Sequence, residues 1–248
     1  MDICVHKSGT MQQIQLLASR GYVSHFGGEV AAAKAQKLVA RFSELYEVSA
    51  SRGVRYRRRK AGHANASLVM HPVHATMNFQ WIVLLTEGNH PARQEETLWP
   101  IDDRRHRVVF DHRFELIQLR AKGGGLRWTW RLTHAAFDDI AASIKTAMRH
   151  RGDERDILRI ARSLYAFPGF RGVRQQIYGL TRLFLREWER ARSGPCPYVG
   201  ENASGYLRFI EAHMVPLGAV VDRMLEGQSP FDPAWVYTRE KTLIEREA

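Results

Sequence analysis

The sequence has little cysteine, little lysine and no long apolar run. Its two cysteines, Cys4 and Cys196, are too few for a disulfide framework or a cysteine zinc site. The longest apolar run covers residues 81–85, far short of the ~20 residues that cross a bilayer. The first residues hold no apolar stretch of signal-peptide length, and neither end contains an evident basic amphipathic helix with an exposed aromatic face. We therefore expect a reduced, cytoplasmic protein with no membrane partner.

The motifs of several kinds of enzyme are also missing. The sequence contains no Walker-type phosphate loop, no HExxH, no paired CxxC and no dinucleotide-binding fingerprint. Among the carboxylates, only Asp111 and Glu115, beside a predicted strand, suit a metal-dependent nuclease. We predict no cofactor and no bound metal.

Positive charge, by contrast, is in excess. The chain has 37 Lys and Arg against 26 Asp and Glu, a net charge of +11, and 30 of the 37 cations are Arg. A guanidinium group binds phosphate through two parallel hydrogen bonds and stacks on nucleobases, which an ammonium group cannot do. This composition predicts a nucleic acid as the partner.

The hydrophobic periodicity changes along the chain from mixed to helical. The N-terminal part has helical spacing or strand-like composition at residues 11–18, 31–46, 67–70, 79–86, 113–120 and 126–132. The last two runs alternate around three glycines and predict a β-hairpin. Helices are expected farther on at residues 133–149, 153–165, 173–192 and 206–225, with Pro216 as a possible interruption of the last.

These elements predict an α+β fold class. We expect a small antiparallel sheet of the ferredoxin or RRM-like kind with an N-terminal helix, followed by an Arg-rich helical C-terminal part. The predicted domains are residues 1–133 and 134–248, with a soft boundary.

The densest group of cations lies in residues 52–60, which contain no acid and which we interpret as an exposed basic loop. Its candidate nucleic-acid-binding residues are Arg52, Arg55, Tyr56, Arg57, Arg58, Arg59 and Lys60. Tyr56 offers a ring on which a base can stack. A basic loop without a binding role is the alternative.

Two predicted helices carry rows of arginine at helical spacing. The rows are Arg155, Arg159 and Arg162 in one helix, and Arg182, Arg186 and Arg190 in the next. On the hairpin, Arg127 and Arg131 share a face opposite Trp128 and Trp130, which we expect in the core. Ordinary solvated helix faces, with ion pairs to Glu187 and Glu189, are the alternative.

Histidines allow a metal-independent cleavage of RNA. The RNA supplies its 2′-hydroxyl as nucleophile, so the protein needs only a general base, a general acid and a cation. Our candidate catalytic residues are His25, Arg20 and Tyr22, although a structural role is commoner for any single histidine. Further candidates lie near basic residues: His63, His71, His74, His106 and His112.

In overall character, the sequence resembles the Cas6-like guide-RNA endonucleases of type IV CRISPR systems. The resemblance rests on RYRRRK at 55–60, LRWTWRLT at 126–133 and the two Arg rows. It implies binding and processing of a repeat hairpin RNA within a ribonucleoprotein that contains other subunits. One alternative is a non-enzymatic DNA-binding accessory protein of a plasmid or mobile element. Another is an interaction module for an acidic protein.

Overall fold

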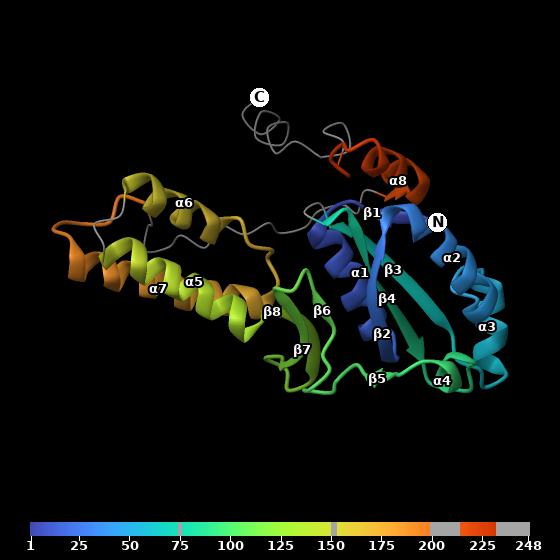
Figure 1. The fold of residues 1–248 in the computed structure, drawn as a ribbon. Helices are drawn as coiled ribbons and strands as arrows, with labels where there is room; N and C mark the ends of the chain where they lie inside the picture. Colours follow the sequence, from blue (N-terminus) through green and yellow to red (C-terminus); the bar gives the residue numbers. More distant parts are fainter. Residues whose placement is uncertain (74–75, 150–152, 199–213, 232–248) are drawn as a thin grey trace, which may run out of the picture. The chain divides into compact units, whose positions relative to one another are not determined.

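The computed structural model describes residues 1–73, 76–149, 153–198 and 214–231, which belong to two compact units (Figure 1). The first unit comprises residues 1–101 and the C-terminal segment at 214–231, and the second comprises the described residues from 102 to 198. The predicted boundary near Thr133 falls inside the second unit, between the hairpin and the helix that follows it. Within the described part of the chain, no helix is both long and apolar enough to cross a bilayer.

An antiparallel sheet with the strand order β3-β4-β2-β5 lies at the centre of the first unit. Its strands are β2 (Tyr22–Ala31), β3 (Ala66–Val73), β4 (Asn78–Thr86) and β5 (Trp99–Pro100). Composition predicted β3 and β4, whereas β2 contains two glycines and was not expected. Every neighbouring pair is antiparallel, so these strands lack the split βαβ connection of a ferredoxin-like sheet.

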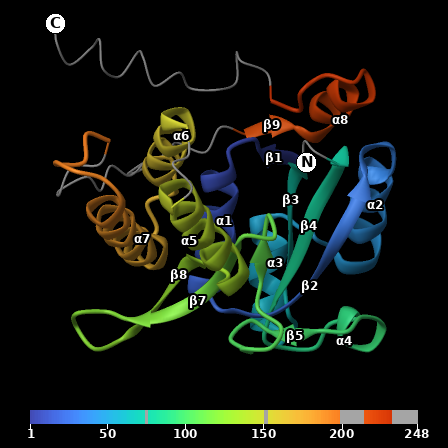
Figure 2. The ribbon, with the colours of Figure 1, turned by 60° about the vertical axis from the view of Figure 1, so that its left-hand side comes forward.

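Helices pack on both faces of this sheet (Figure 2). The helices of the first unit are α1 (Lys7–Ser19), α2 (Ala32–Tyr46), α3 (Arg52–Lys60), α4 (Ala92–Glu95) and α8 (Leu217–Leu225). The strand register places Phe26 and Trp81 on one face, where both rings pack against Phe42 of α2 at 6.0 and 5.1 Å between centroids. It places His25 and His71 on the other face, where Thr10 of α1 hydrogen-bonds to His71.

The C-terminal segment returns to the start of the chain. Strand β9 (Met214–Pro216) pairs antiparallel with β1 (Asp2–Cys4), with buried Val215 opposite buried Ile3. The helix expected at 206–225 is therefore wrong at 214–216, while residues 206–213 lie outside the described residues. Pro216 explains the change, because its ring and missing N–H fit the residue before a helix and not the interior of one.

A three-stranded sheet and three long helices build the second unit. The strands are β6 (Val109–Phe110), β7 (Phe114–Arg120) and β8 (Leu126–Leu132), in that order. The helices are α5 (His134–Arg149), α6 (Glu154–Tyr165) and α7 (Arg171–Ala191). The hairpin and the three helices are confirmed, and so is the α+β class with small antiparallel sheets and a helical later part. Thr133 and Asp153 act as N-caps through side-chain oxygens that accept backbone N–H bonds from Ala136 and Arg155.

The hairpin packs against the first turns of α7. Gly172 approaches β8 so closely that an ideal Cβ on it would lie 2.5 Å from the carbonyl oxygen of Trp130. Its N–H donates to the Thr129 hydroxyl at 3.3 Å, and the Gln176 amide bonds both backbone groups of Leu132. Because these contacts join the hairpin to α7, the hairpin and the helices form one unit. The predicted boundary at Thr133 therefore does not divide the hairpin from the helices.

Residues 52–60, interpreted from sequence as a loop, form helix α3. The interpretation as a loop was wrong. The sequence gives no sign of a helix here, because the segment has no apolar stripe and none of its residues is buried. Ser51 caps the first turn by accepting from the Val54 N–H at 3.4 Å. Four cations occupy the last turn, where the negative end of the helix dipole stabilises them.

A pair of glycine substitutions in α7 tests the close contact with β8. Gly172→Ala should lower the free energy of unfolding of the second unit by about 1–3 kcal/mol, because the new methyl meets a backbone oxygen that cannot move freely. Gly179→Ala is the control, because its Cβ would meet nothing within 4 Å, and it should stabilise the helix by up to about 1 kcal/mol. Urea denaturation measures both, and equal effects of the two substitutions would contradict the packing.

Candidate nucleic-acid interface

Helix α3 presents a cationic face that contains an exposed tyrosine. Arg52, Tyr56 and Lys60 recur at four-residue intervals and are all exposed, with Arg59 beside them on the same face. Tyr56 is open to solvent, with 66% of the residue exposed. An aromatic ring thus lies between cations one turn before and one turn after it.

Two of the predicted binding residues in α3 turn inward instead. Arg55 donates to the carbonyls of Ala50 and Val48, each at 2.9 Å, and to the Tyr22 hydroxyl at 3.2 Å. Arg58 donates to the carbonyl of Ala64 at 3.2 Å and forms an ion pair with Glu47. These two guanidinium groups hold the helix on the unit, so the outward cations are Arg52, Arg57, Arg59 and Lys60.

Helix α7 carries the same arrangement in the second unit. Arg174, Tyr178 and Arg182 recur at four-residue intervals on an exposed face, and Arg186 extends the row. Tyr178 is 58% exposed, and the guanidinium carbon of Arg182 lies 5.9 Å from its ring centroid, within cation–π range. From Arg174 to Arg186 this face runs about 18 Å along the helix axis.

The two faces share one pattern: a cation, a tyrosine and a cation, spaced four residues apart. We call them the α3 face (Arg52, Tyr56, Arg59 and Lys60) and the α7 face (Arg174, Tyr178, Arg182 and Arg186). The interpretation of the sequence included neither Arg174 nor Tyr178. The signal that could have found them is the spacing itself, because residues 174, 178 and 182 repeat that of 52, 56 and 60.

The other predicted arginines on α6 and α7 differ in whether an acidic side chain pairs with them. In α6, Arg155, Arg159 and Arg162 are all exposed, and Arg159 lies 3.2 Å from Asp156. In α7, the guanidinium of Arg190 is bound to Glu187 at 2.9 Å and does not share the role of Arg182. The predicted row on α6 is thus exposed. On α7, Arg182 and Arg186 belong to the exposed face as predicted, and Arg174 and Tyr178 belong to it in addition.

The hairpin face is only partly available to a ligand. Arg127 is exposed, but Arg131 pairs with Glu115 at 2.5 Å, and Thr129 between them is buried beneath α7. On the opposite side Trp130 is fully buried, as expected, and Trp128 is half-buried.

Arg171, at the start of α7, links the hairpin to that helix. It donates to the carbonyl of Arg120 at 2.8 Å, at the end of β7 nearest the glycine turn. The start of α7 therefore lies beside the end of the hairpin that carries Arg120.

The predicted catalytic residues occupy different environments. His25 lies in β2 and is only 7% exposed, on the sheet face that α1 covers. Tyr22 is also buried, with its hydroxyl bound by Arg55, whereas Arg20 is exposed at the end of α1. Their catalytic role stays a prediction, and a substrate would reach only Arg20 without rearrangement.

The remaining histidine and carboxylate candidates are also placed, except His74, which lies outside the described residues. His71 is buried against Thr10 at 3.1 Å, and His106 bonds Asp103 at 2.9 Å. His63 forms an isolated bridge with Asn89, and His112 lines a pocket of the second unit. Glu115 forms ion pairs with Arg131 and Arg107, which balance its negative charge. Within residues 1–73, 76–149, 153–198 and 214–231, no three potential ligands converge as a metal site.

Comparison with known proteins adds no relative. No protein-family model matches the chain, and no curated protein or solved structure matches it significantly. The function must therefore be inferred from the geometry of the two faces.

The ion pairs of Glu187 provide a pH-dependent test of the α7 geometry. Hydrogen bonds from Arg149 and Arg190 lower the pKa of this carboxyl below its ordinary value of 4.5. The ion pairs therefore stabilise the fold above that pH, and the stabilisation is lost as the pH falls through the lowered folded value. Glu187→Gln should lower the melting temperature at neutral pH, and the difference from the unaltered protein should shrink in acid.

The control is Glu189→Gln, which removes the same charge from an exposed position two residues farther along α7. It should leave the melting temperature nearly unchanged at both pH values. Equal melting temperatures for the two variants at neutral pH would contradict the role of Glu187.

Proposed function

We propose that this protein binds RNA and holds a short hairpin, and that the α3 face and the α7 face each offer a surface on which a nucleotide strand can bind. The observation that carries the proposal is the exposed tyrosine placed between two cations, which recurs on a helix of each unit. Guanidinium and ammonium groups contact phosphates, and a tyrosine ring stacks on a base. One such face therefore supplies both kinds of contact to a single nucleotide strand.

The tyrosines favour unpaired bases over a duplex. A base inside a duplex is already stacked and paired, whereas the bases of a hairpin loop are open to aromatic side chains. Stacking of a base on such a ring is worth about 1–3 kcal/mol. The exposed rows on α6 and α7 can follow the phosphates of a stem, and an exposed ring such as that of Tyr56 or Tyr178 suits an unpaired base.

The proposal extends to cleavage of the bound hairpin without metal, within a ribonucleoprotein like those that the sequence resembles. Because RNA carries its own nucleophile, the reaction should persist in EDTA and should stop when the 2′-hydroxyl at the cleaved position is replaced by hydrogen. Electrophoresis of end-labelled hairpins measures both effects. Product formation from the deoxy-substituted hairpin would contradict this chemistry, and absence of any product would restrict the function to binding.

Two other functions use the same cations differently. A DNA-binding accessory protein needs only the arginine rows to contact a duplex, and an acidic protein would pair with the same guanidinium groups. Neither role uses the exposed rings of Tyr56 and Tyr178. Competition between hairpin RNA, duplex DNA of the same sequence and an acidic polypeptide separates these alternatives, and a preference for hairpin RNA is expected.

Substitutions on the α3 face separate stacking from charge. Tyr56→Ala should weaken hairpin binding by about tenfold and leave its salt dependence unchanged, because stacking on a base releases no counterions. Replacing Arg52, Arg59 and Lys60 by Gln should weaken binding and reduce the salt slope by about 0.7 for each single-strand phosphate that the protein no longer neutralises. Fluorescence anisotropy across a salt series measures both quantities.

The matched control for charge is Lys34→Gln with Lys37→Gln on α2, since both lysines are exposed in the same unit but lie on another helix. These changes should alter affinity and slope much less than the α3 changes. If both sets of substitutions reduced the slope equally per charge, binding would depend on net charge and the α3 face would have no special role.

A further inference from the structure

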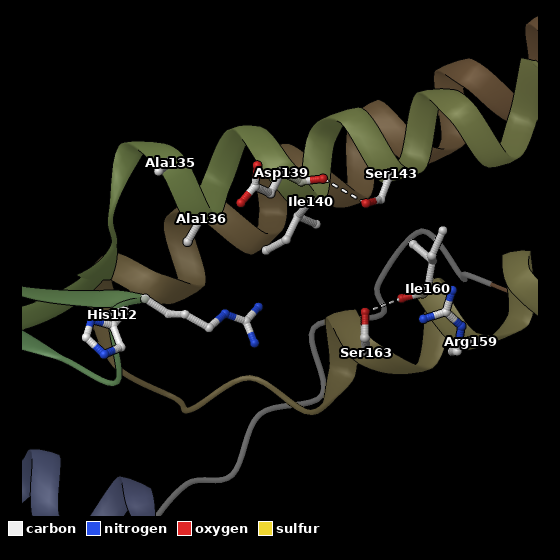
Figure 3. Close-up of a pocket in the computed structure, with 10 residues that line it drawn as sticks. His112, Ala135, Ala136, Asp139, Ile140, Ser143, Arg159, Ile160 and Ser163 are labelled. Atoms are coloured by element: carbon white, nitrogen blue, oxygen red, sulfur yellow. Dashed lines mark hydrogen bonds between the residues drawn. The ribbon is translucent and has the colours of Figure 1, made fainter. Parts of the chain in front are cut away.

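The second unit contains an open pocket that lies outside the α3 and α7 faces and shares only Arg159 with the α6 row. It lies between α5, α6 and the turn that joins β6 to β7, and has a volume of about 520 Å³ (Figure 3). Asp139, Ile140 and Ser143 line it from α5, and Arg159, Ile160 and Ser163 line it from α6. This volume lies within the range of small-molecule sites.

An unusual turn forms one wall of the pocket. Phe110 accepts from the Arg113 N–H at 3.2 Å, and the two residues between them, Asp111 and His112, both have a φ of 52°. These values are typical of a type I′ turn, in which most non-glycine residues are strained but Asp and His are tolerated. The turn brings His112 and Arg113 to the pocket as neighbours.

The polar groups of the pocket fit two parts of one ligand. Arg113 and Arg159, the latter also paired with the exposed carboxylate of Asp156 at 3.2 Å, supply guanidinium groups suited to phosphate. The hydroxyls of Ser143 and Ser163 donate to the carbonyls of Asp139 and Ile160 at 2.8 and 2.7 Å, so their remaining capacity is to accept. These hydroxyl oxygens and the Asp139 carboxylate therefore suit ligand groups that donate hydrogen bonds.

A bare phosphate would use only the cations of this lining. A nucleoside phosphate also offers ribose hydroxyls and base amino groups, which donate hydrogen bonds to the acceptors. Its base has apolar faces that Ile140 and Ile160 can cover. The combination of cations, acceptors and isoleucines thus fits a nucleotide better than an inorganic anion.

We propose that this pocket binds a nucleoside monophosphate group, with Arg113 and Arg159 at the phosphate and Asp139 at the ribose. Since the protein is proposed to hold RNA, the group is the phosphorylated terminal nucleotide of the bound hairpin. This step rests on the proposed RNA binding, but the pocket can be tested separately because a free mononucleotide carries the same group.

The experiment compares one hairpin in three forms: with a 5′-phosphate, with a 3′-phosphate, and with hydroxyls at both ends. One of the phosphorylated forms should bind about tenfold more tightly than the hydroxyl form, as expected for charge-assisted hydrogen bonds. Ser143→Leu should abolish that gain by removing an acceptor and placing a larger apolar side chain among the polar groups of the pocket, and the hydroxyl form should keep its affinity. Ala142→Leu, at an exposed position beside the pocket residue, should preserve the gain.

Arg113→Gln provides a second variant, because it removes one of the two guanidinium groups of the pocket and leaves the turn residues Asp111 and His112 unchanged. It should reduce the gain from the phosphate, whereas Lys145→Gln, at an exposed cation of α5 that does not line the pocket, should not. Circular dichroism and thermal melting confirm that each variant is folded.

A free nucleoside monophosphate, titrated by calorimetry, distinguishes the source of the group. Binding of the mononucleotide that Ser143→Leu removes, without any binding of hairpins, would support the pocket and overturn the proposed RNA function. Normal binding of the hydroxyl-ended hairpin, with no gain from either phosphate and no mononucleotide binding, would overturn the pocket and leave the RNA function intact. A gain that survives Ser143→Leu would also overturn the pocket.

Discussion

The excess of guanidinium groups over carboxylates is the constraint on which this structure depends. With 37 cations and 26 acids, ion pairs alone cannot satisfy the arginines. Several arginines instead donate to backbone carbonyls that secondary structure leaves open, namely Arg55, Arg58, Arg93, Arg171 and Arg223. These residues stabilise loops and helix ends, a use that composition cannot separate from ligand binding. The arginines available to a polyanion are those that remain on the outer helix faces.

Periodicity predicted the elements that bury a regular apolar set. The stripe of Ile177, Leu180, Phe184 and Trp188 in α7 and the alternation in β8 led to correct assignments because the core requires those positions. Helix α3 could not be predicted in this way, since its attachment comes from the polar contacts of Arg55 and Arg58. Strand β9 is too short to show a period. The division into units depends on the contact between Gly172 and Trp130, which joins residues 42 positions apart.

The candidate site was predictable in composition and only partly in detail. The sequence placed Arg52, Tyr56, Arg59 and Lys60 within one basic segment, but it took the helix to show that they share a face. Arg182 and Arg190 are both exposed, and what distinguishes them is the ion pair of Arg190 with Glu187, a buried glutamate on the same helix. The lining of the nucleotide pocket comes from a turn and two helices that are separate in the sequence, so no local sequence pattern predicts the pocket. His112 was only one of several histidines near basic residues.

The pairing of β1 with β9 bears on the order in which the protein can acquire its structure during synthesis. Residues 102–198 are contiguous apart from three undescribed positions, so the second unit can form its contacts while the ribosome is still translating the remainder. The first unit needs Val215, Leu217 and the buried residues of α8 to close the core around Ile3 and Val5. The part translated first is therefore completed last, and until then the apolar residues that β9 and α8 cover stay open to solvent.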